Sequence, residues 1–152
     1  MWNEICNQHA FDLLKKWCNE GFLQKTNLSA KERFYAEEVL RRAFAHPEIG
    51  KLHMAESSAM IYAKRHNINI VLSENRDTMH VVNKFKYFKG LKIWGALEVL
   101  SEAMIQGILE VKEETDIDHY LKEYSSHTRQ FFKESHINAI KEKVCIELKS
   151  KR

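Results

Sequence analysis

Short β-branched segments alternate with helical segments along this chain, and this alternation most constrains its fold. Residues 69–73 form the clearest strand pattern, and residues 91–94 form a second. Helical patterns cover residues 54–66, 78–88 and 96–106. A strand, helix and strand in this order pair in parallel through a right-handed crossover. We therefore predict a helix-rich, three-layer α/β/α domain with a short parallel central sheet.

Further elements are predicted from start and stop signals. Ser29 and Glu32 have the capping-box spacing, which predicts a helix that runs to about Ala45 and ends before His46-Pro47. The remaining predictions are a helix over residues 2–20, a strand over 22–26, an edge strand over 108–111, an acidic connector over 113–118 and a last helix over 128–149.

Length and composition restrict the class of protein. The chain has 152 residues, enough for one domain with a sizeable core. No apolar run is long enough to span a membrane, and the first residues lack a secretion-signal pattern. The three cysteines favour neither a disulfide framework nor a cysteine-based zinc site, so we expect a cytoplasmic protein with no membrane contact. A net charge of +3 permits RNA binding without indicating it.

Acidic residues gather where a parallel sheet would place a site. Ligands bind beyond the carboxyl ends of such strands, here the loop that holds Glu74, Asn75 and Asp77. With Glu56 on one helix and Glu4 on another, these side chains supply the oxygen ligands that Mg²⁺ and Mn²⁺ prefer. Each residue also has a structural interpretation, as a helix cap, a first-turn anion or a solvated side chain. Both interpretations stay open.

One stretch joins basic and aromatic residues. Its basic members are Lys84, Lys86, Lys89 and Lys92, interleaved with Phe85, Tyr87 and Phe88, and Arg76 precedes them. Such a stretch can hold a nucleic-acid backbone and stack its bases. The alternative is a solvated helix whose aromatic side chains are buried.

Three segments resemble one known family. Residues 53–63 look like the "GE-x-x-A-x-x-x-A" helix of PIN-domain proteins, and residues 70–77 look like the strand and acidic loop that follow it. Residues 95–109 are similar to the family's "G-x-L-x-x-L…A…G-hydrophobic" segment. The resemblance is best over residues 50–112 and loose over 1–49, while 113–152 form a C-terminal helical extension of a single domain, 1–152.

The resemblance implies a divalent-metal-dependent ribonuclease fold, in a family with many toxins of toxin–antitoxin pairs. Glu56 matches the acid of the "GE" helix, and Glu4 would match an earlier helix acid. Asp77 matches a second, more variable acid of the loop. By the resemblance, Glu56, Asp77 and Glu4 are catalytic, and Glu56, Asp77, Glu74 and Asn75 hold Mg²⁺ or Mn²⁺.

Three departures from the family bear on activity. Ala55 replaces the glycine before the helix acid, and Asn75 stands where an aspartate is usual. The family also opens with a central strand that ends in an aspartate, and nothing before Trp2 matches it. A shortened start, a strand donated by another chain, or a degenerate binding domain would each explain this. We expect a homo-oligomer, or a protein partner that supplies or covers a sheet edge.

Three functions therefore remain open. The first is a PIN-like endoribonuclease of toxin type that uses Mg²⁺ or Mn²⁺ to cleave RNA phosphodiesters. The alternative is a catalytically degenerate PIN-like module that acts by protein–protein association, as a regulator or an inhibitory partner. A helical adaptor with no nucleic-acid role is the third.

Overall fold

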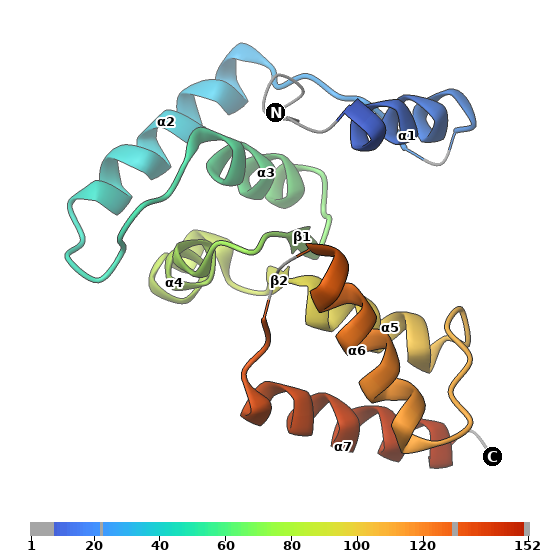
Figure 1. The fold of residues 1–152 in the computed structure, drawn as a ribbon. Helices are drawn as coiled ribbons and strands as arrows, with labels where there is room; N and C mark the ends of the chain where they lie inside the picture. Colours follow the sequence, from blue (N-terminus) through green and yellow to red (C-terminus); the bar gives the residue numbers. More distant parts are fainter. Residues whose placement is uncertain (1–7, 22, 129–130, 151–152) are drawn as a thin grey trace. The chain divides into compact units, whose positions relative to one another are not determined.

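The computed structural model describes residues 8–21, 23–128 and 131–150, and its chain divides into two compact units, Met1–Ile93 and Trp94–Arg152. Figure 1 shows the elements in order. The first unit holds α1 (Gln8–Asn19), α2 (Ala30–Phe44), α3 (Met54–Arg65), β1 (Ile70–Leu72), α4 (Arg76–Lys84), the short 3-10 helix η2 (Lys86–Phe88) and most of β2 (Lys92–Trp94). The second unit holds α5 (Ala96–Ile105), α6 (Glu114–Thr128) and α7 (Glu134–Ser150).

Helix α2 begins where the sequence predicts. The Glu32 amide donates to Ser29 Oγ at 3.3 Å, and the Ser29 amide donates to Glu32 Oε2 at 2.8 Å, so the capping box is confirmed. The buried Glu32 carboxylate also lies 3.1 Å from His66 Nε2. Hydrogen bonds from the Ser29 side chain and backbone, aided by His66, lower the pKa of Glu32 to about 2. One carboxylate thus caps α2 and connects it to the end of α3.

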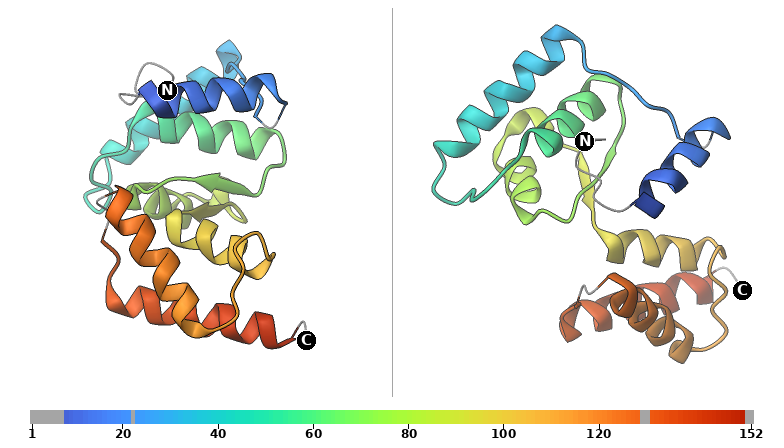
Figure 2. Two further views of the ribbon diagram at one scale, coloured as in Figure 1. Left: turned by 45° about the vertical axis from the view of Figure 1, so that its right-hand side comes forward. Right: turned by 45° about the horizontal axis from the view of Figure 1, so that its top comes forward.

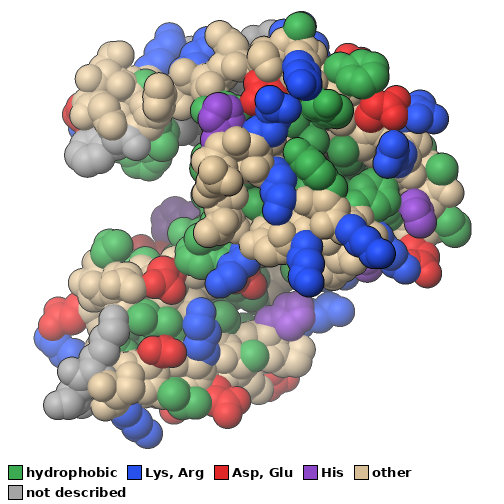
Figure 3. All heavy atoms as spheres, turned by 180° about the vertical axis from the view of Figure 1, so that it is seen from behind, with side chains coloured by type: hydrophobic (Ala, Val, Ile, Leu, Met, Phe, Trp, Pro, Cys, Tyr) green, Lys and Arg blue, Asp and Glu red, His purple; other side chains and the backbone are tan. Residues whose placement is uncertain are grey.

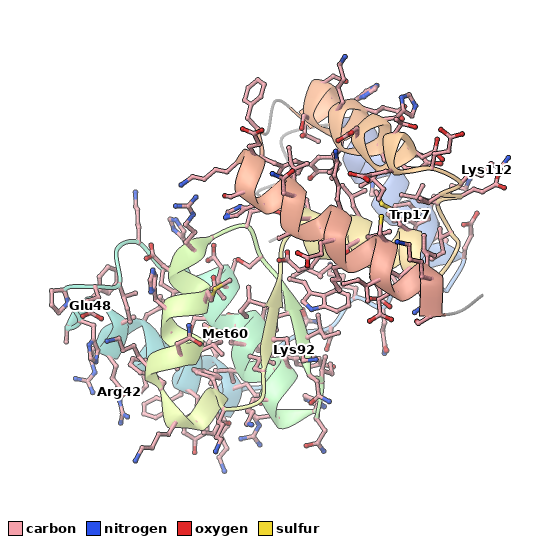
Figure 4. The ribbon with its side chains drawn as sticks, turned by 90° about the horizontal axis from the view of Figure 1, so that it is seen from below. Trp17, Arg42, Glu48, Met60, Lys92 and Lys112 are labelled. Atoms are coloured by element: carbon pink, nitrogen blue, oxygen red, sulfur yellow. The ribbon has the colours of Figure 1, made fainter. Side chains whose placement is uncertain are left out.

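The core of the first unit lies between α2, α3 and the segments that follow. Figure 2 shows α2 and α3 side by side, and the Ser57 hydroxyl donates to the Ala36 carbonyl at 2.6 Å where they meet. Met60, labelled in Figure 4, is fully buried among these elements. The buried apolar residues of this core are Ala36, Val39, Ala43, Ile49, Leu52, Met60, Ile61, Ala63, Val71, Val81, Phe88 and Leu91.

The sheet of the described chain has two parallel strands, β1 and β2. The Lys92 amide donates to the Asn69 carbonyl at 2.8 Å beside the paired strands. Both predicted strands form, one or two residues shorter than expected, and α4 lies in the crossover between them. A helix-rich α/β fold is therefore confirmed, while the three-layer PIN-like arrangement remains a prediction.

The second unit is helical, with α7 in contact with both α5 and α6 (Figure 2). Its core is separate from that of the first unit and contains Met104, Ile105, Ile117, Leu121, Ile140 and Val144. The predicted edge strand over 108–111 does not form. The amides of Ile108 and Leu109 donate to the Ala103 carbonyl at 2.9 and 3.1 Å, so they close α5 rather than pair with a strand. Gly107 supplies the left-handed turn, with φ +73°.

Three other boundaries differ from prediction, and one more predicted strand does not form in the described residues. The helix predicted over 78–88 begins at Arg76 and breaks at Phe85, which is extended (φ −96°, ψ 108°) before η2. The predicted acidic connector is the first part of α6, because Asp116 accepts hydrogen bonds from the Lys112 and Glu113 amides and caps that helix.

The last helix begins at Glu134, not at residue 128. Residues 23–26 form no strand, and Phe22 lies outside the described residues.

The expectation of a single domain over residues 1–152 stays a prediction, because two compact units can belong to one domain. None of the helices within the described residues combines the length and apolar character needed to cross a membrane.

Candidate functional site

An open pocket of about 700 Å³ lies at the carboxyl end of β1, within the first unit. Its walls come from the segment before α3, the first turns of α3, and the loop between β1 and α4. The residues that line it are Lys51, His53, Ala55, Glu56, Ala59, Leu72, Ser73, Glu74, Asn75 and Asp77. We call it the acid pocket. The sequence pointed to this strand end, and the structure brings Glu56, Glu74, Asn75 and Asp77 together there.

Asp77 uses both carboxylate oxygens to hold a loop that lies far away in sequence. The Gly50 amide donates to Oδ1 at 2.9 Å, and the Lys51 amide donates to Oδ2 at 2.7 Å. These two backbone hydrogen bonds lower the pKa of Asp77. A Cβ at Gly50 would lie 3.1 Å from Oδ2, so glycine permits the close approach. Asp77 therefore fastens the loop before α3 to the first turn of α4.

Glu56 and Asn75 are also engaged. The His53 amide donates to Glu56 Oε2 at 3.1 Å, which caps α3, and Asn75 Nδ2 donates to Glu56 Oε1 at 3.3 Å. Asn75 Nδ2 donates to the Lys51 carbonyl at 2.9 Å, and Asn75 Oδ1 accepts from the Asp77 amide at 3.0 Å. Asn75 is thus the N-cap of α4, and its side chain connects Glu56 with the backbone of Asp77.

The structure does not gather every predicted residue. Glu4 lies outside the described residues, so its predicted role stays a prediction. Lys51 and His53 line the pocket without having been singled out from the sequence. The available signal was their position just before Glu56, in the segment that enters α3.

The predicted Mg²⁺ or Mn²⁺ site stays a prediction, and the contacts of its residues bear on it. Across residues 8–21, 23–128 and 131–150, no group of three or more His, Cys, Asp or Glu side chains is arranged to hold a metal. Mg²⁺ requires near-octahedral oxygen coordination. Here the oxygens of Asp77 and Glu56 already accept N–H hydrogen bonds. What the pocket does show is a polar network that fixes three chain segments.

The predicted basic residues separate. Lys84 and Lys86 line another groove of the first unit, together with Arg42 and Arg65. Arg76 is exposed in the first turn of α4, and the Lys89 carbonyl accepts a hydrogen bond from Lys64 Nζ at 2.9 Å. Neither Arg76 nor Lys89 lines that groove.

No protein-family model matches this chain, and no curated protein or solved structure matches it. The likeness to PIN-domain proteins therefore depends on the residues of the sequence itself.

Proposed function

We propose that this chain is a nuclease-related, PIN-like module that acts by association with another protein chain and does not cleave RNA by itself. The observation that carries the proposal is the state of Asp77, both of whose carboxylate oxygens accept backbone hydrogen bonds from Gly50 and Lys51.

Metal binding would compete with these contacts. A carboxylate that turned to a cation would leave the two amides without their acceptor, and hydrogen bonds to charged groups are among the stronger ones. Asn75, where the family usually has an aspartate, adds no charge to attract the cation and instead donates to Glu56. Both features favour a structural role for these residues.

The side of β1 that faces away from β2 supports association. Among the described residues β1 pairs with β2 alone, so its other edge has no strand beside it. A groove of about 590 Å³ runs past this strand, α3 and residues 25–28, and its apolar lining includes Met54, Tyr62 and Ile70. Leu72 is 66% exposed and Ile68 is 44% exposed. An open strand edge beside exposed apolar side chains is suited to a strand from another chain.

A divalent-metal-dependent endoribonuclease of toxin type remains the second candidate. One observation favours it: Glu56, Glu74 and Asp77 line the same open pocket, next to Lys51. This candidate requires further ligands from outside the described residues.

Sedimentation velocity tests the association, with a second copy as the first partner to examine. We expect the wild-type chain to dimerise at micromolar concentration. Leu72→Lys should abolish the dimer, because it places a charge at the strand edge. Met79→Lys on α4 is the matched control, since Met79 is 50% exposed. A wild-type chain that remains monomeric would contradict self-association.

An RNA-cleavage assay with Mn²⁺ separates the two candidates. We expect no cleavage by the wild-type chain, and no metal-dependent change in its melting temperature. Cleavage that disappears in Glu56→Gln would overturn the proposal in favour of the nuclease.

A further inference from the structure

A second groove of the first unit has a different character from the acid pocket. Its volume is about 1060 Å³, and it lies between α2, the end of α3 and residues 84–88. Basic and aromatic side chains dominate its lining, so we call it the basic–aromatic groove. Figure 3 shows a face of this unit on which Lys and Arg side chains surround hydrophobic ones.

The charge of the groove is positive. Arg42, Arg65, Lys84 and Lys86 line it, against the single carboxylate of Glu38. Arg42 and Glu48, which pairs with Lys84, lie toward the same end of the unit in Figure 4.

The ion pairs around the groove leave Arg42 available to another anion. Arg42 Nε lies 3.9 Å from Glu38 Oε2, and the Arg42 side chain is 70% exposed. Arg65 Nε lies 3.6 Å from Oε1 of the buried Glu32, so this pair is not an exposed one. The more exposed Arg42–Glu38 pair contributes little to stability, and another anion can take the place of Glu38. A phosphate group can therefore replace Glu38 as the partner of Arg42.

Two aromatic side chains that line the groove are more than half exposed. Phe34 on α2 is 59% exposed, and Tyr87 on η2 is 52% exposed. Tyr35 presents its ring beneath the Arg65 guanidinium, whose carbon lies 5.9 Å from the ring centre. Planar rings next to cations provide the two contacts that a single nucleic-acid strand requires, base stacking and phosphate pairing.

We propose that the basic–aromatic groove binds single-stranded nucleic acid, with Arg42 and Lys86 on the phosphates and Phe34 and Tyr87 stacked on bases. The groove is slightly larger than an ordinary ligand pocket of about 300–1,000 Å³, which suits a segment of a few nucleotides. Stacking and phosphate contacts do not read sequence, so we expect binding with little base preference. This proposal is independent of the association at β1.

Fluorescence anisotropy with a labelled twelve-nucleotide oligo-uridine tests the groove in the full-length chain. We expect saturable binding in the micromolar range that weakens as salt rises, because phosphate contacts release counterions. The double variant Arg42→Gln/Lys86→Gln should bind about tenfold or more weakly, and its salt dependence should be shallower. Phe34→Ala/Tyr87→Ala should lose about tenfold or more at every salt concentration, with an unchanged salt slope.

The matched control is Lys112→Gln/Lys122→Gln, which removes the same charge from exposed positions of the second unit. We expect less than a twofold change. Equal loss in the control would overturn the proposal, as would equal affinity for a duplex of the same length. Displacement of the strand by an equimolar poly-glutamate peptide would also overturn it, in favour of an acidic protein ligand. Circular dichroism melting curves should confirm that each variant is folded.

Discussion

The two compact units differ in net charge and in the pockets and grooves that they contain. Residues 1–93 carry 15 Lys and Arg against 10 Asp and Glu, whereas residues 94–152 carry 9 against 11. The acid pocket, the basic–aromatic groove and the groove beside β1 all belong to the first unit. The second unit contributes helices around an apolar core. Substitutions in the pocket and grooves of the first unit can therefore be compared with substitutions in the apolar core of the second unit.

The largest loss of stability should come from substitutions in the two apolar cores. Phe88 is fully buried in the first core, and Phe88→Ala should destabilise that unit by about 3–5 kcal/mol through lost contacts and a cavity. Ile117→Ala should destabilise the second unit by about 2–5 kcal/mol. Hydrogen exchange resolved along the chain measures both. If either substitution lowered protection equally in both units, the two cores would form one cooperative unit.

The next effect concerns Glu32, the carboxylate that connects α2 to α3. Its pKa of about 2 in the folded chain lies below its usual value of 4.5, so its stabilisation is present above pH 4.5. That stabilisation should be lost as the pH falls from 4.5 toward 2. Glu32→Gln should lower the melting temperature at pH 7 by several degrees and flatten its dependence on pH in this range.

The control for this substitution is Glu37→Gln, an exposed carboxylate on the same helix. It should leave both the melting temperature and its pH dependence nearly unchanged. An identical pH profile for wild type and Glu32→Gln would show that another acid governs the acid transition.

A smaller effect compares two aspartates that accept the same kind of hydrogen bonds. Asp77 binds amides 26 and 27 residues away, whereas Asp116 binds amides three and four residues away. Asp77→Ala should lower the melting temperature of the first unit by roughly 3–6 °C, because it releases a tertiary contact. Asp116→Ala removes only a local cap and should lower that of the second unit by roughly 1–3 °C. Equal effects would mean that the loop at Gly50 is held by other contacts.

The smallest effect lies on the surface of the second unit. Lys141 Nζ lies 2.7 Å from Asp118 Oδ2, and this hydrogen bond raises the pKa of Lys141. The stabilisation is present below the usual pKa of 10.5 and should be lost as the pH rises through the higher folded value. Because its partners are exposed, Lys141→Met should change the melting temperature at pH 7 by less than about 3 °C. A larger change would mean that this pair carries the packing of α6 on α7.

The sequence predicts this fold best where the determinants are local. Ser29 and Glu32 lie three residues apart and mark the start of α2 without help from the rest of the chain. The break at Phe85 depends instead on tertiary contacts, since that side chain packs on the first core and its ring lies 5.7 Å from His46. A helical pattern over 78–88 contains no sign of either contact.

The candidate site divides in the same way. The strand followed by Glu74, Asn75 and Asp77 indicates where the pocket lies, because the end of a strand is a local feature. The partners of Asp77 are backbone amides, which have no signature in the side-chain sequence. The sequence therefore indicates which acids meet, but not that the carboxylate oxygens of Asp77 and Glu56 accept hydrogen bonds. The cations of the basic–aromatic groove were predicted only in part, because Arg42 and Arg65 come from two other helices.

The hydrogen bond from Ser57 to the Ala36 carbonyl has a consequence for the range of sequences that this fold accepts. Both residues are fully buried, and both are small, so the backbones of α2 and α3 come close at this point. Residues of both helices line the basic–aromatic groove and the groove beside β1. A bulkier residue at either position would push the two helices apart and so change the shape of both grooves, although Ala36 and Ser57 line neither of them.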